Sequence, residues 1–409
     1  MTIKHYDVIL VGAGVSGSFA ALKIAKEYPD VKVALFDMGR PPAKRRSQMW
    51  GFLGLFPNSD GKLYTNDLKN VEDMVGKRKA ISAKKWMDDY LDKIIPNMKI
   101  IKDTNINKNL EKKIKKAKFD IQKNDHVQLF PKDVHAIAKH MGSIFYHCKN
   151  ITNYFDTEII SIKKEKKLFI LTTTEEDEVY SCKKLLLNIG RSGWRQASKL
   201  YEELGIIKNN DNAKFGIRIE MPVDMLPDFN ESHCTLVRDD LEIGPFCWEG
   251  SIIPEDHIDM AVSAFRSNES RWKTDKVSFN LMGNRKFPSG GYQQVDRVGQ
   301  LSFIIANERI IKEKISTIMN KKSKTTIIEE YDWLTKALKE VSAFVPDLLT
   351  KAYYHLPTIY PMIPKINVKT NMETDVKNLY VAGESAGIYG ITSAILTGLI
   401  AADSICKGK

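Results

Sequence analysis

The strongest constraint on the fold comes from a hydrophobic run that leads directly into a glycine-rich turn. Residues 6–12 read YDVILVG, a buried-strand pattern, and the turn at residues 12–17 reads GAGVSG. A helical pattern follows the turn, and a second strand pattern, KVALFDM at residues 32–38, completes a βαβ unit. A strand before the glycines and a helix after them are the context that a dinucleotide-binding fingerprint requires.

Each glycine of this turn has its own physical role in such a fingerprint. Gly12 permits the tight turn, Gly14 lets the backbone approach a pyrophosphate, and Gly17 lets the helix lie close to the strand. The helix N-terminus offers free amides and positive potential to the phosphates. Asp37 ends the second strand, where its carboxylate can accept hydrogen bonds from ribose hydroxyls. These features predict a bound dinucleotide, but they do not distinguish NAD from FAD.

A second motif near the C-terminus makes that distinction. Residues 378–387 read NLYVAGESAG, and a long apolar helix begins near Ile391 or Thr392. An extended FAD needs a second anchor for its ribitol far along the chain, which Glu384, fixed at a strand end by Gly383, can provide. The helix N-terminus would face the pyrimidine edge of the flavin, where reduction places negative charge. We therefore predict FAD as the cofactor.

The order of strand and helix patterns predicts an α/β chain with a Rossmann-like FAD-binding fold and an inserted α+β substrate domain. Three strand patterns within residues 151–189 form a meander that returns to the first sheet, and a helical pattern is predicted near residues 302–319. The expected limits are 1–209 for the FAD-binding domain, with a helical, lysine-rich insertion on its surface at about 66–126, 210–355 for the inserted domain, and 356–409 for the C-terminal return.

Composition limits the remaining classes. The longest apolar stretch, residues 393–405, is interrupted by Thr397, Gly398 and Asp403, and it is shorter than the roughly 20 residues of a membrane span. The N-terminus leads directly into a strand, so we expect no secretory leader. The five cysteines are scattered and form no C-x-x-C pair. We expect a cytoplasmic protein without a membrane span, a disulfide framework or a metal site.

The formal charge of +11 leaves a nucleic-acid partner open. Lysine and asparagine are abundant throughout the chain, which an AT-rich coding sequence would also produce. The densest basic run, KKIKKAK at residues 112–118, interleaves Ile114 and Ala117 with its lysines. We favour a solvated helix face for this run.

Several further stretches resemble the family of uncharacterised FAD-dependent dehydrogenases found in many bacteria, itself distantly similar to amine and amino-acid oxidases. The family's "FSDGKL" is similar to NSDGKLYT at residues 58–65, its "GHSARDT" to GRSGW at residues 190–194, and its "FAIGVRIEHP" to AKFGIRIEMP at residues 213–222. The similarity extends from residue 7 to residue 405 in the family's order. It implies an FAD-dependent oxidoreductase.

The resemblance also suggests cofactor contacts. Ser59, Asp60 and Lys62 lie in the stretch that is similar to the family's flavin-contacting loop, where Lys62 could place its charge near flavin N1 or the phosphates. Simple turn chemistry is the alternative for this Ser-Asp-Gly sequence. We also expect Gly190, in a strand-end turn, to bind the cofactor.

The chain departs from the family at three points. Where the family has "FCMCPGG", the chain has FCWEG at residues 246–250, which puts two-thiol chemistry there in doubt. The histidine of "RIEHP" is Met221, and "GEGAG" is GESAG at residues 383–387. These changes leave cofactor binding intact but weaken any inheritance of substrate chemistry.

Four residues are candidates for catalysis. Arg218 and Glu220 alternate with isoleucines and would face one side of a strand, where the arginine could orient a carboxylate or a phosphate; a surface ion pair is the alternative. His355 is a candidate general base, or else a structural histidine. Tyr389 follows Glu384 in the turn and is expected to line the pocket.

The predicted function is that of an FAD-dependent dehydrogenase or oxidase, in which a small organic substrate gives a hydride to flavin N5 and an external acceptor, such as oxygen, a quinone or a protein, reoxidises the flavin. Residues 66–375 contain no second glycine fingerprint of the kind that binds NAD(P)H in a dedicated domain. Two alternatives stay open: a flavoenzyme that modifies a nucleic acid or a nucleotide precursor, and a non-catalytic FAD-binding module.

Overall fold

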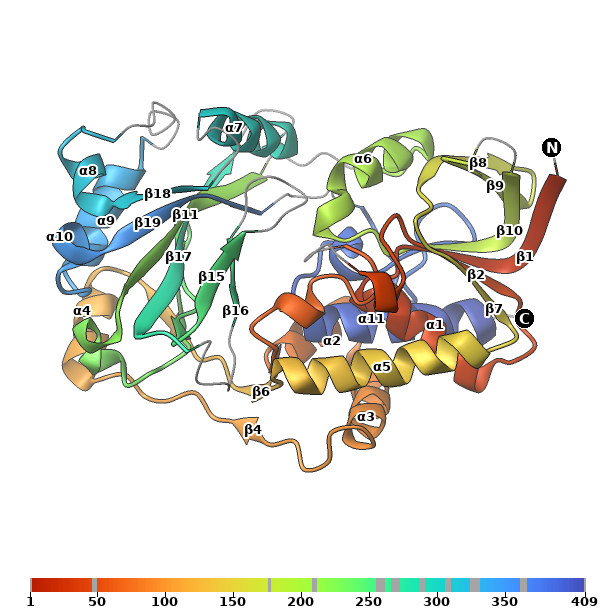
Figure 1. The fold of residues 1–409 in the computed structure, drawn as a ribbon, viewed down its shortest axis with the longest axis horizontal. Coiled ribbons are helices and arrows are strands. Elements are labelled where there is room, and N and C mark those ends of the chain that lie inside the picture. Colours follow the sequence, from red (N-terminus) through yellow and green to blue (C-terminus); the bar gives the residue numbers. More distant parts are fainter. Residues whose placement is uncertain are drawn as a thin grey trace.

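In the computed structural model, the N-terminal βαβ unit forms the centre of a seven-stranded sheet (Figure 1). Strands β7, β2, β1, β10 and β20 are parallel, while β9 and β8 form an antiparallel meander beside β10. Their bounds are β1 Thr2–Val11, β2 Val33–Phe36, β7 Ile151–Tyr154, β8 Ile159–Glu165, β9 Leu168–Thr173, β10 Glu178–Leu187 and β20 Leu379–Val381. The structure describes residues 2–45, 50–175, 178–207, 212–254, 262–265, 273–286, 291–305, 310–323, 332–360 and 366–407.

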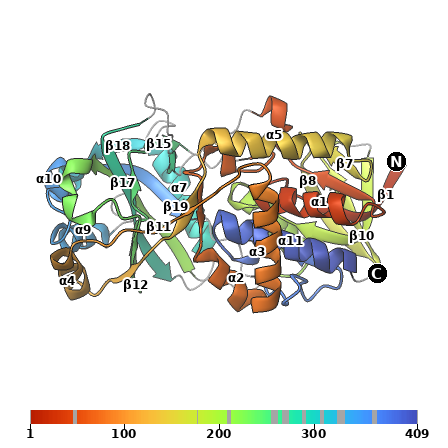
Figure 2. The same cartoon turned by 90° about the horizontal axis from the view of Figure 1, so that it is seen from below.

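The C-terminal parts of β1 and β10, and the short strands β2 and β20, are apolar because both faces of the sheet are covered there. Ile9, Leu35 and Leu186, for example, have no exposed surface. Helices α1 (Val15–Glu27) and α11 (Ile391–Lys407) pack against each other on one face. Helices α3 (Lys77–Asp92) and α5 (Pro131–His147) lie outside them (Figure 2). The predicted α/β class, with its N-terminal βαβ unit and its C-terminal strand–helix return, is confirmed.

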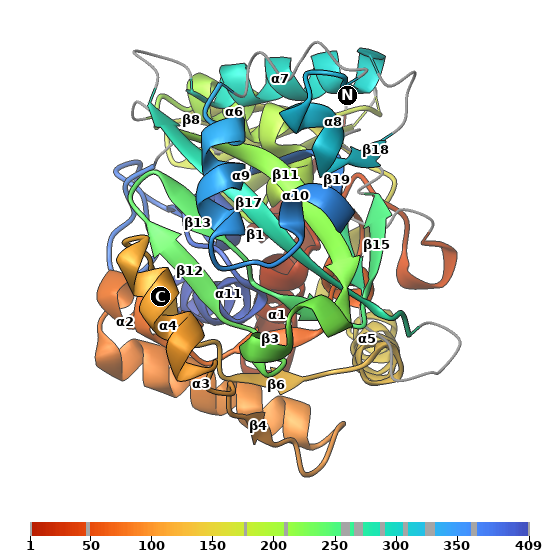
Figure 3. The same ribbon diagram turned by 90° about the vertical axis from the view of Figure 1, so that its left-hand side faces the viewer.

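A second, antiparallel sheet forms the other half of the molecule (Figures 1 and 3). Its order is β18, β19, β11, β17, β13, β12 and β5, with β14 also paired to β17. The long central strands β11 and β17 pair along their full length, and helices α9 and α10 lie over one face. The bounds are β5 Asp120–Gln122, β11 Asn212–Pro222, β12 Thr235–Arg238, β13 Leu241–Ile243, β14 Cys247–Trp248, β17 Lys276–Lys286, β18 Ile311–Lys314 and β19 Tyr353–Tyr360.

The lysine-rich segment at residues 66–126 is divided between the two halves. Its helices α2 (Asp67–Val75) and α3 (Lys77–Asp92) pack against α11. Strand β5, by contrast, pairs with β12 of the second sheet, and α4 (Lys108–Lys116) lies beside it (Figure 3). The segment is therefore not confined to the surface of the cofactor half.

The basic run on α4 is a solvated helix face. Leu110 and Ile114 are buried, whereas Lys112, Lys113 and Lys116 are exposed. Apolar residues four positions apart lie on one face of a helix, so the lysines are left on the solvent side.

The prediction of one continuous helix near residues 302–319 is wrong. Helix α7 (Gly291–Ile305) ends within this range, and β18 and the short helix α8 (Ile315–Met319) follow. Strand β18 forms because its backbone pairs with β19, a partner about 40 residues away in the chain that local periodicity does not reveal.

The remaining elements complete the two halves. They are β3 Lys62–Tyr64, β4 Ile100–Ile101, β6 His126–Gln128, α5 Pro131–His147, α6 Trp194–Glu203, β15 Ser251–Pro254, β16 Val262–Phe265, α9 Leu334–Ser342 and α10 Leu348–Lys351. Among the described helices, none combines the length and the apolar character needed to cross a bilayer.

Candidate functional site

A cavity of about 380 Å³ lies where the two halves meet. Its walls begin at the carboxyl ends of β1, β2, β10 and β20 and reach across to β11 and β17 of the second sheet. In open α/β sheets, ligands bind at the carboxyl ends of the parallel strands. The cavity is therefore the place where the predicted cofactor residues can be tested against the structure.

The three glycines of the N-terminal turn have different structural requirements. Gly12 has a φ of +98°, and a Cβ at this position would lie 2.6 Å from the Asn188 carbonyl oxygen. A Cβ on Gly17 would lie 1.8 Å from the Gly12 carbonyl oxygen. A Cβ on Gly14 would meet no described atom within 4 Å, and Gly14 lines the cavity. The fold itself requires Gly12 and Gly17, whereas only an occupant of the cavity requires Gly14.

Asp37 both closes this turn and faces the cavity. Its Oδ2 accepts a hydrogen bond from the Ala13 amide at 2.6 Å, and its Oδ1 accepts one from the Gly39 amide at 2.7 Å. Burial raises the pKa of Asp37, and these backbone hydrogen bonds oppose the rise. A third backbone hydrogen bond, from Gly51, leaves about one acceptor site of the carboxylate for a ribose hydroxyl, so the predicted role is compatible with a structural one.

Asn188, which follows β10, was not predicted from the sequence. Its Oδ1 accepts a hydrogen bond from the Ser16 hydroxyl at 2.9 Å. Its Nδ2 is buried and has no hydrogen-bond partner among the described residues, although the residue lines the cavity. A buried amide donor of this kind needs an acceptor. A cofactor oxygen in the cavity would supply one, and the uncovered Gly14 backbone at the start of α1 is open to a pyrophosphate, so the residues of this part of the cavity fit FAD.

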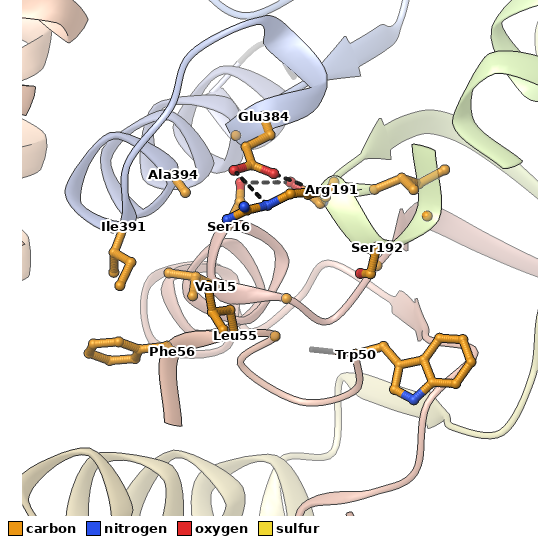
Figure 4. A pocket seen from close by; sticks show the side chains of 18 of the residues that line it. Val15, Ser16, Trp50, Leu55, Phe56, Arg191, Ser192, Glu384, Ile391 and Ala394 are labelled. Atoms are coloured by element: carbon orange, nitrogen blue, oxygen red, sulfur yellow. Dashed lines mark hydrogen bonds and ion pairs between the residues drawn. The ribbon is translucent and has the colours of Figure 1, made fainter. Parts of the chain in front are cut away.

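Glu384 lies beside this turn in the cavity wall (Figure 4), because a Cβ on the preceding Gly383 would lie only 3.1 Å from the Ser16 Cβ. Its Oε2 accepts a hydrogen bond from the Arg191 amide at 2.8 Å, and its Oε1 lies 3.9 Å from the Arg191 guanidinium. Gly383, with a φ of +68°, turns the chain so that this carboxylate faces the cavity, and Gly190 lines the wall beside it. The sequence identified Glu384 but not its partner.

The N-terminus of α11 also borders the cavity. Gly390, Ile391 and Tyr389 line it, whereas the Thr392 side chain is buried and is not among the lining residues. Asp67, at the start of α2, accepts a hydrogen bond from the Ser393 amide in the first turn of α11. Burial raises the pKa of Asp67 to about 7. No local pattern indicates this contact, because the two residues are far apart in the chain.

The opposite end of the cavity, here called the polar end, consists of Asp60, Lys62, Arg218, Cys247 and Asn280. The Lys62 side chain is fully buried, and its Nζ lies 3.0 Å from Asp60 Oδ2 and 4.0 Å from Cys247 Sγ. Burial alone would raise the pKa of Asp60, but the adjacent Lys62 ammonium holds it below its ordinary value. Lys62 and Asp60 therefore form a buried ion pair within the wall.

The Ser59 side chain makes the hydrogen bonds of a simple turn. Its hydroxyl donates to the Phe56 carbonyl at 3.0 Å and accepts from the Gly61 amide at 3.1 Å. The residue still borders the cavity. Its side chain fixes the loop that carries Asp60 and Lys62.

The structure separates the four candidates for catalysis. Arg218 and Tyr389 line the cavity, but Glu220 and His355 do not. Glu220 Oε2 lies 2.8 Å from Lys312 Nζ and 3.4 Å from His355 Nε2. Burial would raise the pKa of Glu220, but these two partners lower it to about 2. Arg218 and Glu220 share a face of β11, but only Arg218 lies over the cavity. Glu220 and His355 contact each other outside the cavity, which indicates a structural role for both.

Cys247 and Asn280 of the polar end were not among the predicted site residues. Cys247 lies within the FCWEG stretch, where the sequence drew attention to a missing second cysteine. Asn280 is a buried polar residue of β17, two positions after the buried Ser278. A polar side chain at an inward-facing strand position is the signal that could have identified it.

No family model matches the chain, and no curated protein matches it in sequence. The resemblance to the dehydrogenase family therefore stays a prediction. Solved structures that align with the chain include glycine oxidase from Geobacillus kaustophilus, 14% identical over 99% of this chain and 95% of that one, with a TM-score of 0.46.

Two further solved structures are the halogenase PltM in complex with phloroglucinol and FAD (13% identity, 96% and 67% coverage, TM-score 0.47) and a geranylgeranyl bacteriochlorophyll reductase-like protein from Thermoplasma acidophilum (12% identity, 100% and 79% coverage, TM-score 0.43). These values are too low to transfer a substrate or a reaction to this chain.

Proposed function

We propose that the chain is an FAD-dependent oxidoreductase that oxidises a small organic substrate. The main support is that one cavity joins the Gly14 backbone, Asn188, Glu384 and the α11 N-terminus to a polar end formed partly by the second sheet. An extended cofactor needs several anchors from distant parts of the chain, and these residues supply them in one continuous wall. A substrate would bind at the polar end.

Each part of the wall has a distinct task in holding the cofactor. Asp37 would accept hydrogen bonds from the ribose, while the Gly14 backbone and the N-terminus of α1 would hold the pyrophosphate. Glu384 would bind ribitol hydroxyls. The positive end of α11 would stabilise negative charge on the reduced flavin. FAD, when bound, supplies the chemistry of hydride acceptance at N5.

The proposal predicts a yellow protein that releases FAD on denaturation. Asp37 and the glycine turn suit the adenosine half of the cofactor, which FMN lacks. The released flavin is identified by chromatography and mass spectrometry. Release of FMN, or of no flavin, contradicts the proposal.

The source of electrons needs a separate measurement. Because the sequence between the two FAD motifs lacks a second glycine fingerprint, we expect an organic substrate rather than NAD(P)H to reduce the flavin. The oxidised protein is mixed anaerobically with NADH or NADPH in a stopped-flow instrument, and the visible absorbance of the flavin is followed. Slow, non-saturating bleaching is expected. Fast, saturable bleaching would instead make the protein a nicotinamide-driven reductase.

Glu384→Ala should weaken FAD binding by about 1.5 to 3 kcal/mol, the usual contribution of a charged hydrogen bond. Glu384→Gln should have a smaller effect, because it keeps an acceptor for the Arg191 amide. Affinity is measured by titrating apoprotein with FAD. Glu203→Ala is a matched control, since Glu203 also accepts a backbone hydrogen bond, from the Ile162 amide, but does not line the cavity. Equal FAD affinity in Glu384→Ala and wild type would exclude Glu384 as an anchor.

A further inference from the structure

Arg218 is a buried cation in the wall of the polar end. Only 5% of the residue is exposed. Its Nη1 donates to Asn280 Oδ1 at 3.0 Å, and its Nη2 and Nε lie 3.0 and 3.3 Å from Ser278 Oγ. Both partners are neutral. A guanidinium carries five N–H donors, so these contacts do not use all of them.

The positive charge of Arg218 is not neutralised within the protein. Among the described residues, no carboxylate oxygen lies within 4.0 Å of its guanidinium. Arg238, by comparison, pairs with both Asp240 and Glu340. Burying a charge without a counter-ion is costly, so buried charges are normally paired. Arg218 therefore lacks the partner that its burial requires, and it faces a cavity that can hold one.

The neighbouring charges indicate how much negative charge this partner carries. Lys62 is the other cation of the polar end, and Asp60 compensates it at 3.0 Å. One uncompensated positive charge is therefore left, at Arg218. A single negative charge balances it, whereas a phosphate dianion would leave excess negative charge in a buried site.

We infer that the substrate is a carboxylate, and that Arg218 binds its carboxylate group while Asn280 and Ser278 hold the guanidinium in place. The planar fork of a guanidinium matches the two oxygens of a carboxylate. Arg218 is thus a residue that determines substrate class, and the inference rests on the proposed function. It goes further by stating which charge the substrate must carry.

The test compares carboxylates with their own uncharged amides. Acetate, hexanoate and phenylacetate are each titrated against the FAD-loaded protein beside acetamide, hexanamide and phenylacetamide, and the visible flavin spectrum reports binding. At least one carboxylate should bind about tenfold or more tightly than its amide, as expected for a charge-assisted contact. Absence of a preference in all three pairs overturns the inference.

Arg218→Gln should reduce this preference to about twofold or less, with FAD content unchanged. Ser278→Ala is the matched control, because it removes a partner of Arg218 but leaves the charge, and it should keep most of the preference. If Arg218→Gln does not fold, Arg218→Lys takes its place. Arg218→Lys should still prefer carboxylates to amides, but less strongly, because an ammonium group lacks the bidentate geometry of a guanidinium. A preference that survives in full in Arg218→Gln or Arg218→Lys overturns the assignment.

The midpoint potential of the flavin separates the substrate role from a role toward the cofactor. If Arg218→Gln shifts the potential but keeps the preference for carboxylates, the guanidinium serves the flavin and the inference is wrong. If the wild-type protein binds no FAD, the proposed function fails. The same pairs are then titrated by calorimetry without flavin, so a failure of the proposed function is distinguishable from a failure of the carboxylate site.

Discussion

Gly14→Val should yield a folded protein that retains almost no FAD. In the structure, a Cβ at this position projects into the cavity and meets no described atom within 4 Å. The φ of Gly14 is −60°, which valine adopts without strain. The substitution therefore places a branched side chain where the pyrophosphate has to approach the backbone, without disturbing the protein around it.

The neighbouring glycine provides the contrast. Gly17→Ala would drive its Cβ to 1.8 Å from the Gly12 carbonyl oxygen, so the helix would have to move away from the turn. We expect a clear fall in the thermal stability of this variant, whereas Gly14→Val should melt close to wild type. The comparison uses apoprotein throughout, because bound FAD would itself stabilise the wild type.

FAD content is measured as the ratio of flavin to protein absorbance after purification, and affinity by titrating apoprotein. Gly142→Ala is a control for glycine substitution in general, because its Cβ would make only ordinary contacts with Pro42, 3.7 Å away. If Gly14→Val binds FAD as wild type does, the pyrophosphate does not lie at this turn.

The parts of the site that were predicted from the sequence are local in the chain. The glycine turn, Asp37 and the Gly383–Glu384 turn each have a signature within a few residues, because backbone geometry and strand ends impose it. The structure brings these segments to one cavity at the carboxyl ends of β1, β2, β10 and β20.

The parts that were missed depend on contacts between distant segments. Arg218 and Glu220 are equivalent in the strand pattern, and only the position of the second sheet shows that one faces the cavity while the other pairs with Lys312. Asn188 and Asp67 are single buried polar residues. No periodicity marks such residues, because their importance comes from the atoms that burial leaves without partners.

Asp67 leads to a second large effect, on stability rather than on binding. Only 8% of Asp67 is exposed, and its Oδ2 has no hydrogen-bond partner among the described residues. The Ser393 amide favours the charged form, but burial outweighs it and raises the pKa from 3.8 to about 7. Between these two values, the folded protein binds a proton that the unfolded chain has released.

The sign of the effect follows from this difference in proton binding. Stability falls with rising pH wherever the folded state binds more protons, so Asp67 should destabilise the protein progressively from about pH 4 to about pH 7. Above about pH 7 the loss should level off, at up to about 4 kcal/mol for a shift of roughly three pKa units. Below about pH 4 the carboxyl is protonated in both states, and the penalty disappears.

Asp67→Asn should remove this penalty, because the amide carries no charge and its oxygen can still accept from the Ser393 amide. The variant should exceed wild type in its free energy of unfolding at about pH 8 by up to about 4 kcal/mol, and the difference should shrink toward about pH 4. Urea unfolding of apoprotein across this range measures it. Asp88→Asn is the control, since Asp88 forms a partly exposed ion pair with Lys84, and this substitution should change stability by less than about 1 kcal/mol. If wild type and Asp67→Asn show parallel pH profiles, Asp67 is not protonated in the folded protein near neutral pH.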